Sequence, residues 1–166
     1  QTCALPIYYL AFRVLGMPTS FIGSAISQVF YKQATEEKNK TGIIEKTFIS
    51  TLKKLIILSI PIFLVIFITV QPIFSLVFGE NWKTAGLYAM ILTPMFAIRF
   101  IVVTFTLVPF IFNKNTIDLA FQLGIIVISI LVFLFDIKDF IHLLSLYAVI
   151  LMVYYLSYII FLKKMF

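Results

Sequence analysis

Two arginines lie inside long apolar stretches, where a charged side chain is expected either to bind a ligand or to have a polar partner within the protein. Arg99 stands near the middle of its stretch. An Arg near the centre of a membrane costs about 2.5–3.5 kcal/mol on insertion scales, which favours a position facing a cavity. Its guanidinium stays ionised when buried and suits bidentate contact with phosphate; the structural alternative is pairing with an upstream carboxylate or with helix carbonyl groups. Arg13 lies nearer the start of another apolar stretch. It either contacts the same phosphate group as Arg99 or extends to the lipid headgroups.

The other titratable residues near the apolar stretches are Asp118 and His142. Either could carry a coupling proton, but each lies within a turn of a predicted helix end, where Asp118 can cap its helix and His142 can sit at the wet interface. The single cysteine, Cys3, has no His or Cys partner at a metal-ligand spacing. There is no GxxxxGK[ST] run for a nucleotide phosphate. We therefore expect no catalytic residue, no metal site and no cofactor.

The elements that position these residues follow from the composition. Of 166 residues, 62% are hydrophobic and 12% are charged, and the mean hydropathy is +1.10. A water-soluble domain with a polar shell could hardly reach these values, so a lipid bilayer is the expected solvent. The net charge of +6 comes mostly from basic residues between and beyond the apolar stretches. This placement indicates membrane topology rather than nucleic-acid binding.

Five apolar segments are long enough to cross a bilayer as helices, which predicts an all-α polytopic transmembrane bundle. The predicted spans are residues 8–31, 55–78, 84–112, 117–135 and 140–162. Residues 1–7, QTCALPI, resemble a translated sequencing-library adapter, and we expect them to be non-native.

The basic segment 32–54 is predicted to be a separate amphipathic helix. It contains six Lys and three Glu, with apolar residues such as Ile44, Phe48 and Leu52 at helical spacing. Such a helix would lie along the cytoplasmic face of the membrane. Prolines inside the first three spans predict kinks, which would suit bending between two states but also occur in static bundles.

Lysines are unevenly distributed between the two sides of the predicted bundle. One side has six in residues 32–54, one at Lys114 and two at the C-terminus, whereas the other has only Lys83 and Lys138. The Lys-rich side is expected to be cytoplasmic, because positively charged connections are retained there. This orientation places the C-terminus in the cytoplasm and the start of the first span outside.

Several runs of residues carry a resemblance to a known family. They are YYLAFRVLGMPTSFIGSAISQVFYKQA at residues 8–34, with Tyr9, Arg13 and Pro18, and PIFSLVFGENWKTAGLYAMILTP at residues 72–94, with VFGENW at its centre. Through these residues the chain resembles the polysaccharide-transporter, or oligosaccharide (O-antigen type) flippase, family. That family belongs to the multidrug/oligosaccharidyl-lipid/polysaccharide exporter superfamily. The resemblance is strongest before Pro94.

The resemblance implies two helical lobes around a cavity that opens alternately to the two sides of the bacterial inner membrane. Residues 8–166 would form most of the C-terminal lobe, and we expect an N-terminal lobe upstream. The implied substrate is undecaprenyl-diphosphate-linked oligosaccharide, which is moved outward for surface polysaccharide such as the O-antigen of lipopolysaccharide. Polysaccharide polymerase and ligase machinery are the further partners that the resemblance suggests.

With such a substrate, Arg99 and Arg13 are the residues expected to bind the diphosphate, because an ionised group cannot enter hydrocarbon without a large cost. Gln28 and Gln122 could hydrogen-bond sugar hydroxyl groups. A glutamine in a membrane span also often contacts a neighbouring helix, and this alternative stays open for both.

Three other functions are considered. A drug exporter of the same superfamily would be expected to line its cavity with carboxylates, whereas this chain offers arginine. A membrane-embedded glycan-processing enzyme needs a positioned base, nucleophile or metal, usually on a sizeable extramembrane loop. The outer connections at residues 79–83 and 136–139 are short, so we expect no enzymatic activity. A structural membrane subunit is the third alternative.

Overall fold

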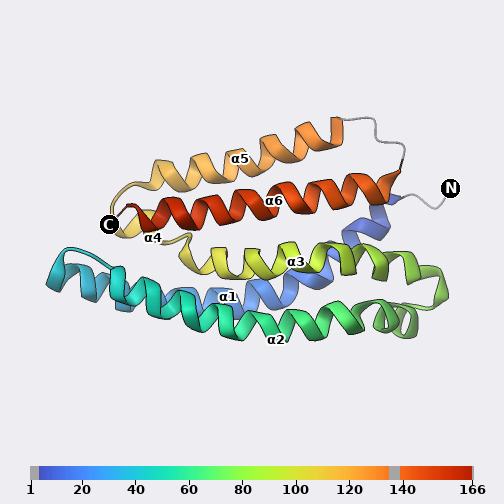
Figure 1. Cartoon of the computed structure of the whole chain (residues 1–166), viewed down its shortest axis with the longest axis horizontal. Coiled ribbons are helices and arrows are strands. Elements are labelled where there is room, and N and C mark those ends of the chain that lie inside the picture. Colours follow the sequence, from blue (N-terminus) through green and yellow to red (C-terminus); the bar gives the residue numbers. More distant parts are fainter. Residues whose placement is uncertain (1–3, 135–138, 166) are drawn as a thin grey trace.

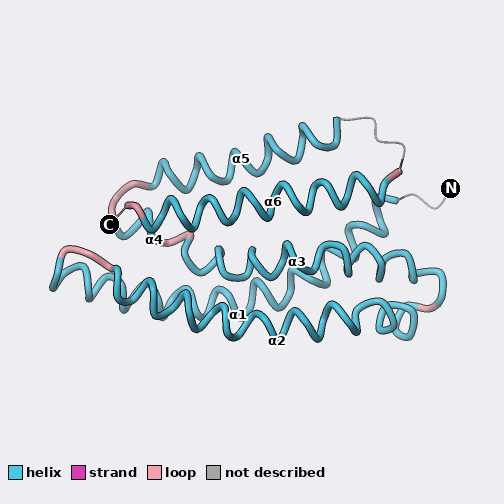
Figure 2. The backbone as a smooth tube through the Cα atoms, in the orientation of Figure 1, coloured by secondary structure: helices cyan, strands magenta, loops and turns pink. Residues whose placement is uncertain are grey.

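The computed structural model describes residues 4–134 and 139–165, and every regular element in these ranges is helical. In chain order the elements are α1 (Ala4–Thr41), α2 (Glu45–Phe78), the short 3-10 turn η1 (Glu80–Trp82), α3 (Lys83–Phe105), α4 (Val108–Ile111), α5 (Asn115–Leu134) and α6 (Phe140–Lys163). Figure 1 shows the long helices side by side in an elongated bundle, and Figure 2 shows that the described connections are short loops.

Within the described residues, five helical segments are long and apolar enough to cross a membrane. They are Pro6–Thr41, Glu45–Phe78, Glu80–Ile111, Asn115–Leu134 and Phe140–Lys163. Even the shortest, with 20 residues, rises about 30 Å at ~1.5 Å per residue, which equals the hydrocarbon thickness of a bilayer. Large apolar side chains remain exposed along these helices, for example Leu76 at 85% and Leu134 at 73%. The predicted all-α polytopic bundle is confirmed.

α3 is the central helix, because it packs against α1, α2 and α6. Its first half presents the small buried residues Ala85, Gly86 and Ala89. A Cβ atom added at Gly86 would lie only 2.8 Å from the Cα atom of Gln71 in α2, so the two backbones nearly touch. Small residues permit such close approach in membranes, where packing rather than expulsion of water joins the helices. The helix that carries Arg99 is therefore enclosed on several sides.

The Lys-rich connections gather at one end of the bundle. Figure 1 shows the turn between α1 and α2, the connection from α4 to α5 and the C-terminus at the same end. The bundle thus separates the Lys-rich connections from the connection between α2 and α3, as expected for segments on opposite sides of a membrane.

Residues 32–54 do not form the separate helix that their sequence predicted. α1 continues to Thr41 and α2 begins at Glu45, so the segment consists of two helix ends and a tight turn. Ile44 and Phe48 are fully buried, and the Phe48 ring centroid lies 4.4 Å from that of Phe105 in α3. The apolar residues that suggested a membrane-surface helix instead pack onto the bundle, which explains the error.

Glu37 joins the two helix ends at this turn. Its carboxylate accepts hydrogen bonds from the backbone N–H groups of Lys46, at 3.1 Å, and Thr47, at 2.8 Å. These donors lie in the first turn of α2 and would otherwise lack a partner within the helix. Gly42 has a φ of 81°, a left-handed conformation that glycine adopts without strain. A carboxylate in α1 therefore caps α2.

The third predicted span, residues 84–112, is interrupted. α3 ends at Phe105 and α4 begins at Val108. Pro109 explains the break, because it has no N–H group for the carbonyl one turn earlier and its ring clashes with that carbonyl. Pro18, Pro61, Pro72 and Pro94 lie inside continuous helices and do not end them.

The last two predicted spans agree closely with α5 and α6. Span 117–135 corresponds to Asn115–Leu134, with Phe135 outside the described residues, and span 140–162 corresponds to Phe140–Lys163. Residues 136–138 of the last outer connection and Cys3 also lie outside the described residues. Residues 4–7 lie in the first turns of α1, but the structure does not test whether residues 1–7 are native, so their non-native origin stays a prediction.

Candidate functional site

Arg99 lies among aromatic rings. The central carbon of its guanidinium is 5.2 Å from the ring centroid of Phe12 in α1 and 5.3 Å from that of Phe96, one turn earlier in α3. The two rings contact each other edge to face, with centroids 4.9 Å apart and an interplanar angle of 69°. A cation within about 6 Å of an aromatic face is attracted by the ring quadrupole. Arg99 thus makes two such contacts, one to each of two helices.

Arg99 has no acidic partner in the described part of the chain. The one ion pair there joins His142 and Asp139, on exposed side chains at the start of α6. Within residues 4–134 and 139–165, the guanidinium also makes no hydrogen bond to a helix carbonyl group. The structural alternatives considered for this arginine are therefore not found among these residues.

Arg13 and Arg99 line one groove between α1 and α3. The groove has a volume of about 430 Å³, and its lining includes Tyr9, Phe12, Arg13, Ser20, Arg99 and Val103. No Asp or Glu of the described residues lines it. The groove combines two guanidinium groups with hydroxyl groups and apolar walls. The two arginines that the sequence singled out separately are brought to one surface by the packing of α1 on α3.

The two glutamines lie elsewhere. Gln28 is exposed on α1 and is not among the residues that line the groove. On α5, the Gln122 amide donates a hydrogen bond to the carboxylate of Asp118, one turn earlier, at 2.6 Å. The structure does not bring either side chain to the arginines, and the contact of Gln122 lies within its own helix.

Asp118 is more deeply buried than a helix cap at a wet surface would be. Its side chain lies in the first turn of α5, but the residue is only 7% exposed. Its Oδ2 atom accepts the hydrogen bond from Gln122, while Oδ1 has no partner among the described residues. The Tyr158 hydroxyl on α6 is likewise buried without a partner there. Asp118 is therefore buried within the bundle rather than exposed at a wet helix end.

His142 lies at the surface, as expected for the wet end of a helix. Its Nδ1 atom is 2.8 Å from Oδ2 of Asp139. The other oxygen of Asp139 accepts the backbone N–H of Ile141 at 3.0 Å and caps α6. This backbone hydrogen bond, together with the one to His142, holds the pKa of the Asp139 carboxyl below its ordinary value. No three His, Cys, Asp or Glu side chains of the described residues gather as metal ligands would.

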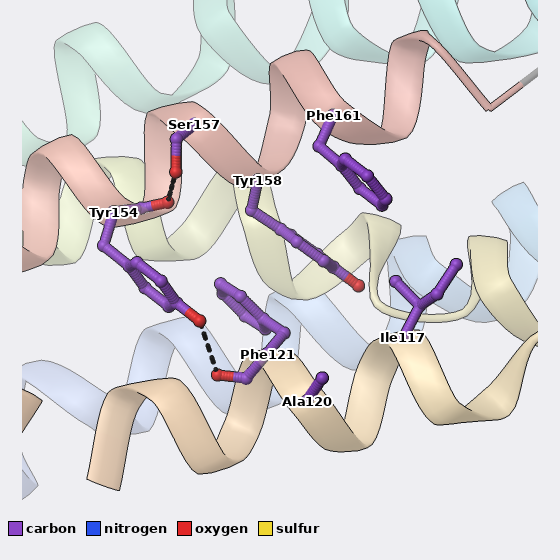
Figure 3. A pocket seen from close by; sticks show the side chains of 7 residues that line it. All are labelled: Ile117, Ala120, Phe121, Tyr154, Ser157, Tyr158 and Phe161. Atoms are coloured by element: carbon purple, nitrogen blue, oxygen red, sulfur yellow. Dashed lines mark hydrogen bonds between the residues drawn. The ribbon is translucent and has the colours of Figure 1, made fainter. Parts of the chain in front are cut away.

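A second cavity, between α5 and α6, was not predicted. It has a volume of about 480 Å³, and Figure 3 shows the rings of Phe121, Tyr154 and Tyr158 beside it. The Phe121 ring centroid lies 5.0 Å from that of Tyr154 and 3.7 Å from that of Tyr158, with nearly parallel planes. The Tyr154 hydroxyl donates to the carbonyl of Phe121 at 3.1 Å. The sequence signal was the spacing of one turn between the two tyrosines, but a single helix does not reveal its partner.

One comparison with known proteins gives a match. A family model described as "Polysaccharide biosynthesis protein" matches residues 1–87, which is just over half of the chain. The match covers α1, α2 and the start of α3; it includes Arg13 and Gln28 but ends before Arg99 and Gln122. No curated protein and no solved structure matches the sequence.

Proposed function

Because the chain belongs to the polysaccharide biosynthesis protein family, we propose that it takes part in moving a lipid-linked oligosaccharide across the bacterial inner membrane. The proposed substrate carries a diphosphate between an undecaprenyl chain and the sugars. The protein acts in polysaccharide biosynthesis as a multi-pass membrane protein. In the proposal its contribution is transport rather than catalysis.

The observation that supports this substrate is the groove between α1 and α3. It presents Arg13 and Arg99, and none of the described carboxylates lines it. A diphosphate cannot cross hydrocarbon unaided, because removing ionised groups from water costs many kcal/mol. Guanidinium groups offset that cost through charge-assisted, bidentate contacts with phosphate oxygens. A cationic groove also favours an anionic substrate over the cations that a drug exporter would carry.

The proposal includes a second lobe and an orientation. An upstream lobe of the same protein would face the groove, and the two lobes would open the cavity to each side of the membrane in turn. The end of the bundle with the Lys-rich connections would be cytoplasmic. Polymerase and ligase machinery would receive the sugar on the outer side.

Complementation tests the proposal. The gene that encodes this chain is expressed in a bacterium that lacks its own surface-polysaccharide flippase, as wild type and as R13A, R99A, R99K and K114A. Lys114 is the matched control, because it is a cation in a loop outside the groove. We expect wild type and K114A to restore surface polysaccharide, R99A to fail, and R99K to restore part of it, since an ammonium lacks the bidentate geometry.

The outcomes test the role of Arg99 and the assigned substrate separately. Normal complementation by R99A at normal abundance in the membrane would show that Arg99 is structural. Failure of a well-expressed wild type in several glycan backgrounds would refute the assigned substrate. If that protein instead conferred resistance to cationic drugs, the exporter alternative would replace it.

A further inference from the structure

Among the described residues, two aromatic rings and no acid contact the Arg99 guanidinium. A carboxylate partner would neutralise the charge and occupy two of the five N–H donors. An aromatic face attracts the cation through its quadrupole and occupies none of them. The donors of Arg99 therefore remain available on a side chain that is nevertheless held in place.

The two rings differ in how firmly they are held. Phe96 is fully buried, at 0% exposure, on the same helix as Arg99. Phe12 is half-buried on α1 and lines the groove. Its ring centroid lies 4.9 Å from that of Phe96 and 5.7 Å from that of Tyr8. Phe96 thus provides a fixed face, and Phe12 provides the face beside the groove.

We propose that Phe12 and Phe96 form an aromatic clamp that positions the Arg99 guanidinium for an anion of the diphosphate class bound in the groove. Both are positioning residues, because they act through Arg99. The choice of a diphosphate rests on the proposed function, whereas the clamp itself requires only that the groove bind an anion through Arg99. The clamp also explains why arginine occupies this position, since its flat cation can lie against two adjoining rings from different helices.

Simple packing is the competing explanation, since phenylalanines also meet elsewhere in the core. Phe63 of α2 and Phe100 of α3 have ring centroids 5.9 Å apart, and neither ring faces a cation among the described residues. Packing depends on the size and shape of a ring, whereas cation–π attraction depends on its charge distribution. Fluorine atoms on the ring edge withdraw charge from the face and change the volume little, so they separate the two effects.

The experiment uses the purified protein encoded by this gene, with phenylalanine carrying one, two or three ring fluorines at position 12, and the same series at Phe63 as the matched control. The probe is farnesyl diphosphate, and its binding affinity is measured at constant ionic strength. We expect stepwise weakening at position 12, to about tenfold with three fluorines, and no trend at position 63. Phe12→Leu should weaken binding similarly, whereas Phe12→Trp should retain it, because indole is the strongest cation–π partner. Thermal unfolding of each variant shows that it is folded.

An affinity that does not change along the position 12 series, or that falls equally at position 63, would overturn the clamp. Absence of farnesyl diphosphate binding by the unsubstituted protein would overturn it as well. The clamp and the proposed function can fail separately. If farnesyl diphosphate binding depends on Arg99 and weakens with fluorination at position 12, but the protein does not complement, the clamp stands and translocation is refuted. If the protein complements and requires Arg99, but fluorination at position 12 does not change binding, translocation stands and the clamp is refuted.

Discussion

A methyl group added at Gly86 meets backbone, whereas the same group at Gly16 meets only the edge of a ring. A Cβ atom at position 86 would lie 2.8 Å from the Gln71 Cα atom and 3.1 Å from the Phe74 Cβ atom, both in α2. At position 16 the nearest atom is a ring carbon of Phe96, at 3.9 Å, which is ordinary van der Waals contact. We expect Gly86→Ala to push α2 and α3 apart and Gly16→Ala to be accommodated.

The two substitutions differ mainly in the steric clash. Comparing them therefore isolates the effect of the clash on the free energy of unfolding. Both replace a helical glycine by alanine, and each gains up to about 1 kcal/mol of helix propensity. Inserting a methyl group into a tightly packed interior typically costs about 1–3 kcal/mol. Because the propensity gain cancels between them, G86A should be less stable than G16A by about 1–3 kcal/mol. At roughly 2–4 °C per kcal/mol for a chain of this size, the midpoint of G86A should be several degrees lower.

Thermal unfolding of the two purified variants in the same detergent and at the same scan rate measures this difference, because operational stability depends on both conditions. The unfolding midpoint of the wild type is expected to equal that of G16A or to lie slightly below it. Equal midpoints for the two variants would show that α2 and α3 separate at no cost. The close approach of their backbones would then not contribute to the position of α3.

Three further substitutions test other contacts. Glu37→Gln should destabilise the turn between α1 and α2 by about 1 kcal/mol, because a charged cap of the α2 N–H groups is lost; exposed Glu36→Gln is the control, and equal midpoints for the two would refute the cap. Lys38→Met should speed amide exchange near α4, because its ammonium donates to the last carbonyl of that helix, and unchanged exchange would count against this contact. Asp139 has a lowered pKa, so its stabilisation of α6 is complete above the ordinary carboxyl pKa and is lost as the pH falls through the lowered value. Asp139→Asn should remove that component from the acid dependence of the unfolding midpoint, and identical pH profiles would contradict it.

The membrane spans could be predicted because the lipid around a span determines its composition directly. A helix surrounded by lipid must be apolar for about 20 residues, and this requirement is visible without knowing any neighbour. The ends of α5 and α6 fall close to the predicted limits for the same reason. Pro109, in contrast, ends a helix where four other prolines do not, and that difference depends on how the surrounding helices cover the backbone.

The segment 32–54 could not be assigned from its pattern, because an apolar stripe does not identify the surface it covers. Ile44 and Phe48 would be placed alike on a membrane-surface helix and on a helix packed against α3. The contact between Phe48 and Phe105 decides the matter, and it joins residues that are far apart in the chain. The limit here is the lack of long-range information in a local pattern.

Only the arginines of the candidate site could be predicted from the sequence, again because a local pattern lacks long-range information. Arg13 and Arg99 stood out because cations are costly in apolar surroundings. Phe12 and Phe96 did not stand out among 19 phenylalanines, since nothing in their own neighbourhoods marks them as partners of an arginine. The cavity beside Phe121 was missed likewise, because its walls come from two helices.

The central place of α3 has a consequence for the order in which the chain enters the membrane. Synthesis proceeds from the N-terminus, so α1 and α2 leave the ribosome before the helix that carries Arg99. Phe12 is on α1 and is therefore already in the bilayer when Arg99 emerges. The nascent α3 meets a ready-made partner for its charge and can leave the insertion machinery alongside α1, without first exposing an unshielded cation to lipid.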